Sequence, residues 1–182
     1  MVAQELLGSN LVRVVNGQRI IARITEAEAY QGEDDLGCHA HAGKTKRNAV
    51  MYGPPGHAYV YFTYGMHWML NAVTGAEGSP AAVLIRAIQP VDGQDLMLRN
   101  RPHLAGTRHW LDGPAKLTQA MAVDRSLNGI DLCEPKSGLF ITPGEVIPDK
   151  AVGVSARVGL FTVPEPWKSI PWRFKITNPL DR

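Results

Sequence analysis

The stretch LVRVVNGQRIIARITEAEAY, from Leu11 to Tyr30, carries the clearest folding signal in the chain. Two runs rich in β-branched residues flank Asn16-Gly17, and this dipeptide between apolar runs is the most specific short signal for a two-residue hairpin turn. The sequence therefore predicts two antiparallel strands, over residues 11–15 and 19–30, at the start of a β-sheet.

The second of these strands carries an unusual acidic face. Side chains two residues apart share a face of a strand, so Glu26, Glu28 and Tyr30 would lie together. The opposite face would carry small side chains that allow close packing against another layer. A second acidic group, Glu33–Asp35, follows in a loop, where we expect it to face solvent or to cap the loop.

The remaining pattern favours strands over helices. Strands are expected over residues 58–64, 67–73, 81–88 (ended by Pro90), 138–142, 151–160 and 172–176. Short helices are expected over residues 2–7, 93–99 and 111–121, the last with Asp112 as its cap. The long loop over residues 31–57 is expected to be functional, because loops of this length are uncommon inside compact domains. This order of elements predicts an α+β fold on a largely antiparallel sheet.

The composition is that of an ordinary globular protein. The 182 residues are 45% hydrophobic and 20% charged, which fits one domain over residues 1–182. No apolar run approaches the roughly 20 residues of a membrane-spanning helix, and Glu5 interrupts the N-terminal stretch where an export signal would be apolar. Two cysteines cannot form a disulfide framework. We therefore expect no membrane partner, no secretion, and a location in the cytoplasm (nucleoid) of a bacterium or the nucleus of a eukaryote.

Basic residues gather in three places, although the formal net charge is only +2. The clusters are Lys44, Lys46 and Arg47; Arg99, Arg101, Arg108 and Lys116; and Lys168, Arg173 and Lys175. A run of charges is usually a solvated face. Clusters of this kind are nevertheless compatible with a nucleic-acid partner.

Three interpretations of the acidic stretch compete: a metal site, an acid/base site and a solvated edge of the sheet. A metal site would recruit Cys38, His39 and His41, but their spacing lacks the paired ligands of structural zinc sites, so we expect no metal and no cofactor. An acid/base site needs one carboxylate beside aromatic rings that stack on a flat substrate. In YVYFTY, alternation separates Tyr61 from Tyr64, so that one can line a pocket while the other leaves it.

Five ordered blocks then resemble a known family. The blocks TEAEAY, YVYFTYGMHWMLN, VLIRAIQP, GPAKL and SARVG are similar to those of the alkyladenine (3-methyladenine) DNA glycosylases, from LLGSNLVR near the N-terminus to WRF near the C-terminus. The resemblance implies a monofunctional base-excision repair enzyme. It also implies a curved antiparallel sheet with flanking helices and a protruding hairpin that enters DNA.

The resemblance assigns the chemistry to three positions. Glu28 would be the base that activates a water molecule, and Arg86 and the main-chain carbonyl of Val158 would help to hold that water. We expect Arg86 to compensate for the burial of the Glu28 carboxylate. Glu26 is expected to be structural and to pair with a nearby basic residue.

The resemblance also assigns the substrate pocket. Tyr30 and Tyr61 would sandwich the extruded base, and His39 would contact the purine edge. Asn71 would clash with the exocyclic amino group of guanine. The implied substrates are alkylated or deaminated purines of the 3-methyladenine, hypoxanthine, ethenoadenine and 7-methylguanine class.

The contacts to duplex DNA come from the hairpin and the basic clusters. Tyr64 would enter the minor groove, with Leu84 as an apolar neighbour. The DNA backbone is expected to contact Lys44, Arg47, Arg101 and Lys116, in a protein acting as a monomer.

Three alternatives remain open at this point. A lysine, with Lys116 the nearest candidate, would make the enzyme a bifunctional glycosylase and lyase. A damaged-DNA binding protein would use the same aromatic and basic residues without chemistry. A metallohydrolase would need the metal site. The chain also departs from the family pattern at Ala40 and His67, where a hydroxyl and an aromatic ring are expected, and these positions bear on substrate range.

Overall fold

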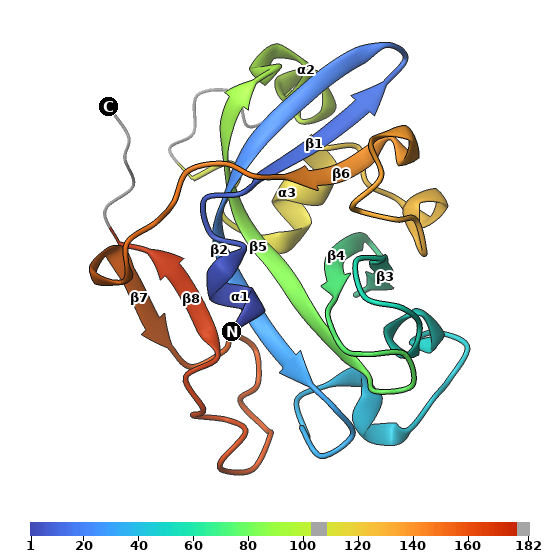
Figure 1. The fold of residues 1–182 in the computed structure, drawn as a ribbon, viewed down its shortest axis with the longest axis vertical. Coiled ribbons are helices and arrows are strands. Elements are labelled where there is room, and N and C mark those ends of the chain that lie inside the picture. Colours follow the sequence, from blue (N-terminus) through green and yellow to red (C-terminus); the bar gives the residue numbers. More distant parts are fainter. Residues whose placement is uncertain (103–108, 178–182) are drawn as a thin grey trace.

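An antiparallel sheet of eight strands forms the centre of the computed structural model, which describes residues 1–102 and 109–177 (Figure 1). The strands are β1 (Asn10–Val15), β2 (Gln18–Gln31), β3 (Ala58–Thr63), β4 (His67–Val73), β5 (Ala81–Asp92), β6 (Leu139–Thr142), β7 (Val152–Ser155) and β8 (Arg173–Ile176). Six strands pair in the order β3-β4-β5-β2-β1-β6, and β8 joins β7 to β2. The predicted α+β fold on a curved, antiparallel sheet is confirmed.

Helices are few and short. The α-helices are α1 (Val2–Glu5), α2 (Gln94–Asn100) and α3 (Pro114–Ala120), and the 3-10 helices are η1 (His39–Ala42), η2 (Ala49–Tyr52), η4 (Arg125–Leu127), η5 (Pro135–Ser137) and η6 (Asp149–Ala151). None of the helices in the part of the chain that the structure describes is long and apolar enough to cross a membrane.

The β1–β2 hairpin forms where the sequence predicts it. Val15 pairs with Gln18, and Asn16 and Gly17 between them have φ of 51° and 75°. Both residues of such a turn need positive φ, which asparagine and glycine tolerate best. The paired strands place the small side chains of Ala27 and Ala29 in the main core.

Two strand boundaries differ from the prediction by more than one residue. Strand β5 does not stop before Pro90 but continues to Asp92, and Pro90 lies opposite Ala22 next to a register shift. A bulge is one of the few places in a sheet that tolerate a residue without an N–H group. Strand β7 ends at Ser155, so residues 156–160, which the sequence predicts as strand, belong to the loop between β7 and β8.

The predicted cap of α3 is wrong. The helix begins after Gly113, whereas the Asp112 carboxylate binds Nδ1 of His109 at 2.7 Å. Pro114 occupies the first helical position, where its missing N–H costs no hydrogen bond. The predicted basic residue Arg108 lies outside the described residues.

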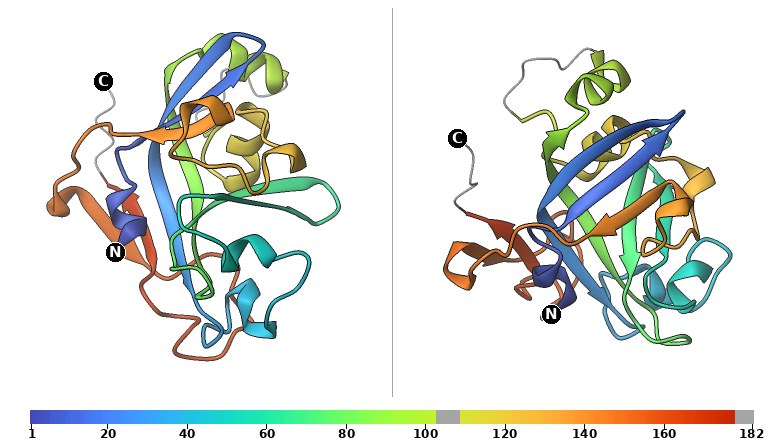
Figure 2. Two further views of the ribbon diagram at one scale, coloured as in Figure 1. Left: turned by 45° about the vertical axis from the view of Figure 1, so that its right-hand side comes forward. Right: turned by 45° about the horizontal axis from the view of Figure 1, so that its top comes forward.

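The long loop after β2 packs against the sheet. It contains η1 and η2, and its buried residues form a second, smaller core with parts of β3, β4 and β5. Tyr30 and Tyr61 pack against this core. Figure 2 shows the β3–β4 hairpin projecting from the body above this loop. The fold therefore sets an aromatic cluster at the base of a protruding hairpin.

Candidate active site

Glu28 lies near the C-terminal end of β2, between two neighbouring strands. It pairs with Leu84 of β5 on one side and Arg173 of β8 on the other, and it is 0% exposed. A buried carboxylate is unfavourable unless other groups donate hydrogen bonds to it or pair with its charge. The partners of Glu28 therefore decide what it can do.

Three donors converge on the Glu28 carboxylate. The backbone N–H of Val158 donates to Oε1 at 2.7 Å, and the hydroxyl of Tyr30 donates to Oε2 at 2.9 Å. Nη1 of Arg86 lies 3.3 Å from the same Oε2. The expected pairing of Arg86 with Glu28 is present. The amide of Val158 is a contact that the sequence did not predict, because the family pattern points to its carbonyl.

Glu26 anchors the other arm of Arg86. Its Oε1 accepts hydrogen bonds from Nε of Arg86 at 2.9 Å and Nε of Arg173 at 2.8 Å, and Nζ of Lys175 lies 3.7 Å from Oε2. Burial opposes ionisation of Glu26, but the bonds from Arg173 and Arg86 outweigh burial and hold the pKa of this carboxyl below its usual value. The predicted pairing of Glu26 with a basic residue is confirmed, and it fixes the Arg86 guanidinium between two glutamates.

A cavity of about 320 Å³ lies in front of this group. This volume is at the lower end of the range for small-molecule pockets. The cavity brings together eight of the residues expected at the site, namely Tyr30, His39, Tyr61, Tyr64, Asn71, Leu84, Arg86 and Val158. Glu28 lies behind this wall, and each of its three donors lines the cavity.

Aromatic rings form one side of the cavity. The Tyr61 ring lies 4.5 Å from the His39 ring in an edge-on arrangement, and 5.2 Å from the Tyr59 ring. Nδ1 of His39 is hydrogen-bonded to the Tyr59 hydroxyl at 2.9 Å. Burial, assisted by the positive charge of Arg47, lowers the pKa of His39 to about 4. His39 is therefore an uncharged imidazole at neutral pH.

Asn71 and Leu84 pair across β4 and β5 and are both buried. Nδ2 of Asn71 donates to the carbonyl of Tyr59 at 3.0 Å, which fixes the orientation of the amide. The sequence predicts Leu84 as an apolar neighbour of Tyr64 in contact with DNA, whereas in the structure Leu84 is 5% exposed and forms part of the cavity wall. A side chain buried in a central strand cannot reach into a duplex.

The turn of the β3–β4 hairpin is exposed. Tyr64 is 83% exposed with φ of 52°, and Met66 beside it is 68% exposed. Tyr64 also borders the mouth of the cavity. The alternation between Tyr61 and Tyr64 thus has the predicted result, with one ring inside the cavity and the other largely in solvent.

The residues expected to contact the DNA backbone differ in how accessible their side chains are. Lys44 and Arg47 are exposed, and the Arg47 guanidinium lies 5.1 Å from the centre of the Tyr61 ring, beside the cavity. Nζ of Lys116 donates to the carbonyl of His109 at 2.7 Å. Arg101 is only 7% exposed, and its guanidinium donates to Oε1 of Gln119 and to a backbone carbonyl. Arg101 therefore holds the α2 and α3 region together and is not available to a phosphate.

The structure contains a buried ion pair next to the cavity, which the sequence did not predict. Asp35 does cap its loop, accepting N–H bonds from Gln31 and Gly37, but it is 0% exposed and faces Arg157. Nη1 and Nη2 of Arg157 lie 2.5 and 2.8 Å from the two Asp35 oxygens. Arg157 stands in the SARVG block, but nothing in a single sequence indicates a partner so distant along the chain.

The candidate metal ligands make separate contacts. Sγ of Cys38 accepts the N–H of Ala40, His39 binds Tyr59, and Nδ1 of His41 lies 3.2 Å from the carbonyl of Glu33. Among residues 1–102 and 109–177, no group of three or more His, Cys, Asp or Glu side chains is arranged to hold a metal ion.

Comparison with known proteins gives a consistent result. Residues 1–179 match the sequence model of the family described as methylpurine-DNA glycosylase (MPG). Relatives named "Putative 3-methyladenine DNA glycosylase" include proteins of Carboxydothermus hydrogenoformans (50% identical over 98% of this chain and 90% of the relative), Methanocella arvoryzae (45%, over 97% and 86%) and Streptomyces avermitilis (44%, over 97% and 82%). The chain therefore belongs to the methylpurine-DNA glycosylase family, whose members are DNA N-glycosylases.

Proposed function

We propose that this protein is a monofunctional DNA glycosylase that flips a damaged purine out of duplex DNA, hydrolyses its N-glycosidic bond and leaves an abasic site. The observation that carries the proposal is the arrangement around Glu28. A buried carboxylate receives three donors, all of which line an aromatic cavity large enough for a small planar group.

Glu28 is assigned the role of general base. Cleavage of a glycosidic bond builds positive charge on the sugar, so an anionic carboxylate stabilises the transition state and accepts a proton from the attacking water. A carboxylate has about four acceptor positions, and the three donors leave one of them, on Oε1, for that water. Arg86 and Val158 border the same space and would orient the water.

The cavity walls are assigned to recognition of the base. Tyr30 and Tyr61 would stack on its two faces, because aromatic stacking accepts any purine. A neutral His39 would contact the purine edge, and the fixed amide of Asn71 would reject guanine. Leu84 is reassigned from intercalation to the apolar wall. We propose 3-methyladenine, hypoxanthine, ethenoadenine and 7-methylguanine as the substrate class.

Contacts with the duplex are assigned to the rim of the cavity. Tyr64 would fill the gap left by the flipped nucleotide, as apolar and aromatic wedges do in other proteins that deform DNA. Lys44, Arg47 and Lys116 would contact the backbone of one duplex per protein monomer.

The test uses a duplex with a single hypoxanthine and, in parallel, methylated DNA. Wild-type protein should release free base and leave strands that break only after alkali, whereas Glu28→Gln should release at most about 1% as much, since the general base is lost. Full activity of Glu28→Gln would remove Glu28 from the mechanism. Breakage without alkali, together with borohydride trapping of an adduct, would indicate a lyase. Tight lesion binding without base release from either substrate would indicate a binding protein.

A further inference from the structure

The buried arginine next to the cavity has no role in the chemistry described above. Arg157 directly precedes Val158, whose N–H binds Glu28, and the Arg157 side chain is 0% exposed. The peptide unit that joins Arg157 to Val158 therefore supplies the N–H group that binds Glu28, the proposed general base.

The Arg157 guanidinium joins three segments of the chain. It binds both oxygens of Asp35, in the loop that leads to His39. Nη1 also donates to the carbonyl of Ala29 in β2 at 3.0 Å, and Nη2 to the carbonyl of Trp167 at 3.2 Å. These four hydrogen bonds need the planar fork of arginine, because a lysine ammonium has only three donors at one point.

The same guanidinium also lies over two aromatic rings. Its central carbon is 4.6 Å from the centre of the Tyr30 ring and 5.2 Å from that of Trp172. These distances are typical of cation–π contacts. Arg157 therefore touches a ring whose hydroxyl donates to Glu28, while the next residue donates its amide to the other oxygen of Glu28.

Stability alone is a poor explanation for this pair. Replacing a buried ion pair by apolar side chains of similar volume is often neutral or stabilising. Arg157 is also imperfectly satisfied, because its buried Nε has no hydrogen-bond partner among the described residues. Apolar side chains could not form the hydrogen bonds that Arg157 makes to β2, to the loop after β2 and to the loop after β7.

We propose that Arg157 and Asp35 form a positioning clamp, which holds the Tyr30 hydroxyl and the Val158 amide on Glu28 in the reactive arrangement. The proposal rests on the proposed function, and it adds two residues that act through others and do not touch the substrate. Misplacement of catalytic groups by about 1 Å can slow a reaction by about 100-fold. Loss of the clamp should therefore reduce the rate of base release much more than the affinity for DNA.

The test separates positioning from stability with three variants. Arg157→Lys keeps the charge but loses the fork, and Asp35→Asn keeps the shape but loses the charge. The double variant Asp35→Leu with Arg157→Met replaces the ion pair by apolar groups. The control is Arg13→Lys, because the Arg13 guanidinium also binds two backbone carbonyls, of Val14 and Gly138, at the β1–β6 side of the sheet.

Single-turnover base release, DNA affinity by fluorescence anisotropy and Tm are measured for each protein. We expect release to fall at least about tenfold in all three clamp variants, with affinity within about threefold of wild type, and the double variant to regain much of its Tm without regaining its rate. Arg13→Lys should lower Tm but leave the rate unchanged.

A double variant with wild-type Tm and wild-type rate would overturn the clamp. Should that variant not fold, a wild-type rate in folded Arg157→Lys or Asp35→Asn would overturn it equally. Failure of the wild-type protein to release any base would instead refute the proposed function.

Discussion

At the scale of the residue, Tyr30 combines two properties in one side chain. Its ring lines the cavity, and its hydroxyl donates to Glu28 at 2.9 Å. Burial and the neighbouring Glu28 charge raise the pKa of Tyr30 well above its ordinary value, so that the hydroxyl stays protonated. A hydrogen bond to a charged group contributes about 1.5–3 kcal/mol. Tyr30→Phe should therefore slow single-turnover release by roughly 10- to 100-fold, with DNA affinity nearly unchanged. An unaltered rate would leave Tyr30 with stacking alone.

His39 links the same cavity to the pH dependence of stability. Its pKa is about 4 in the folded protein and ordinarily 6.5, so between these pH values the unfolded chain binds a proton at His39 and the folded protein does not. The free energy of unfolding should therefore decrease as pH falls from 6.5 to 4. Above pH 6.5 the imidazole is neutral in both states, so the stability that depends on neutral His39 is fully present there. His39→Gln should lose less Tm between pH 7 and pH 5 than wild type. An equal loss in both proteins would show that other groups cause it.

At the scale of the element, the β3–β4 hairpin displays an aromatic ring in a strained turn. Left-handed backbone is unfavourable for residues with a Cβ atom, and Tyr64 has φ of 52°. Tyr64→Gly should raise the free energy of unfolding by roughly 1 kcal/mol relative to Tyr64→Ala, as measured by urea unfolding. Both variants should lose most base release, because neither fills the gap in the duplex. Release at the wild-type rate by either variant would exclude the wedge role.

The same scale shows how far the sequence can predict the structure. Asn16-Gly17 and the alternation through β2 and β3 act locally, so the hairpin, the strands and the separation of Tyr61 from Tyr64 could be predicted. Pro90 continues a strand because a bulge accommodates it, which no local rule indicates. The burial of Arg101 and the pairing of Asp35 with Arg157 depend on elements brought together by the complete fold. Charge type alone did not separate a buried arginine such as Arg101 from an exposed one such as Arg47.

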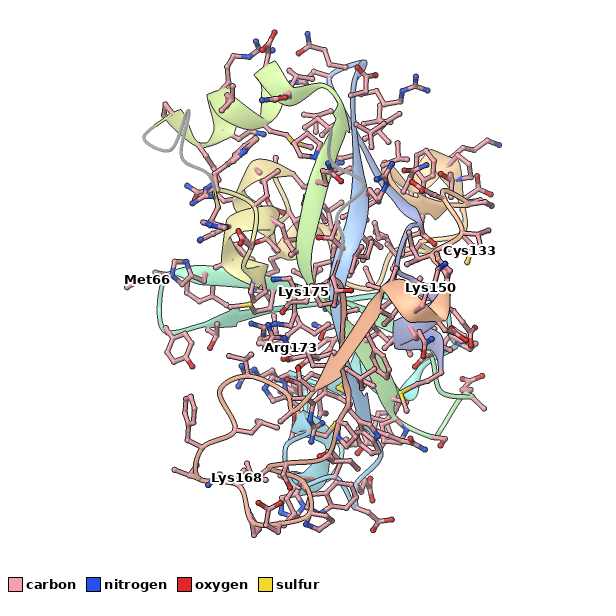
Figure 3. The ribbon with its side chains drawn as sticks, turned by 90° about the vertical axis from the view of Figure 1, so that its left-hand side faces the viewer. Met66, Cys133, Lys150, Lys168, Arg173 and Lys175 are labelled. Carbon is pink, nitrogen blue, oxygen red and sulfur yellow. The ribbon has the colours of Figure 1, made fainter. Side chains whose placement is uncertain are left out.

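At the scale of the whole molecule, binding to DNA should depend strongly on salt. Each basic side chain that neutralises a phosphate releases counterions, so log K falls with log salt by about 0.9 per contact. Arg47→Ala should reduce the slope by about 1, because Arg47 is exposed at the cavity. Lys150→Ala is the matched control, since Lys150 lies on the side opposite Met66 of the hairpin (Figure 3). A slope equally reduced by both variants would argue against a defined contact face.

The order of elements along the chain has a consequence for biosynthesis. Glu28 lies in β2, whereas its amide donor, Val158, and the neighbouring strand β8 come late in the sequence. A ribosome therefore releases the carboxylate and the aromatic hairpin long before it releases the segment that completes their surroundings. During translation the growing chain therefore carries Glu28 and the hairpin before the groups that surround Glu28 in the folded protein. Under the proposed role of Glu28, base excision can begin only after Val158 and β8 have been synthesised.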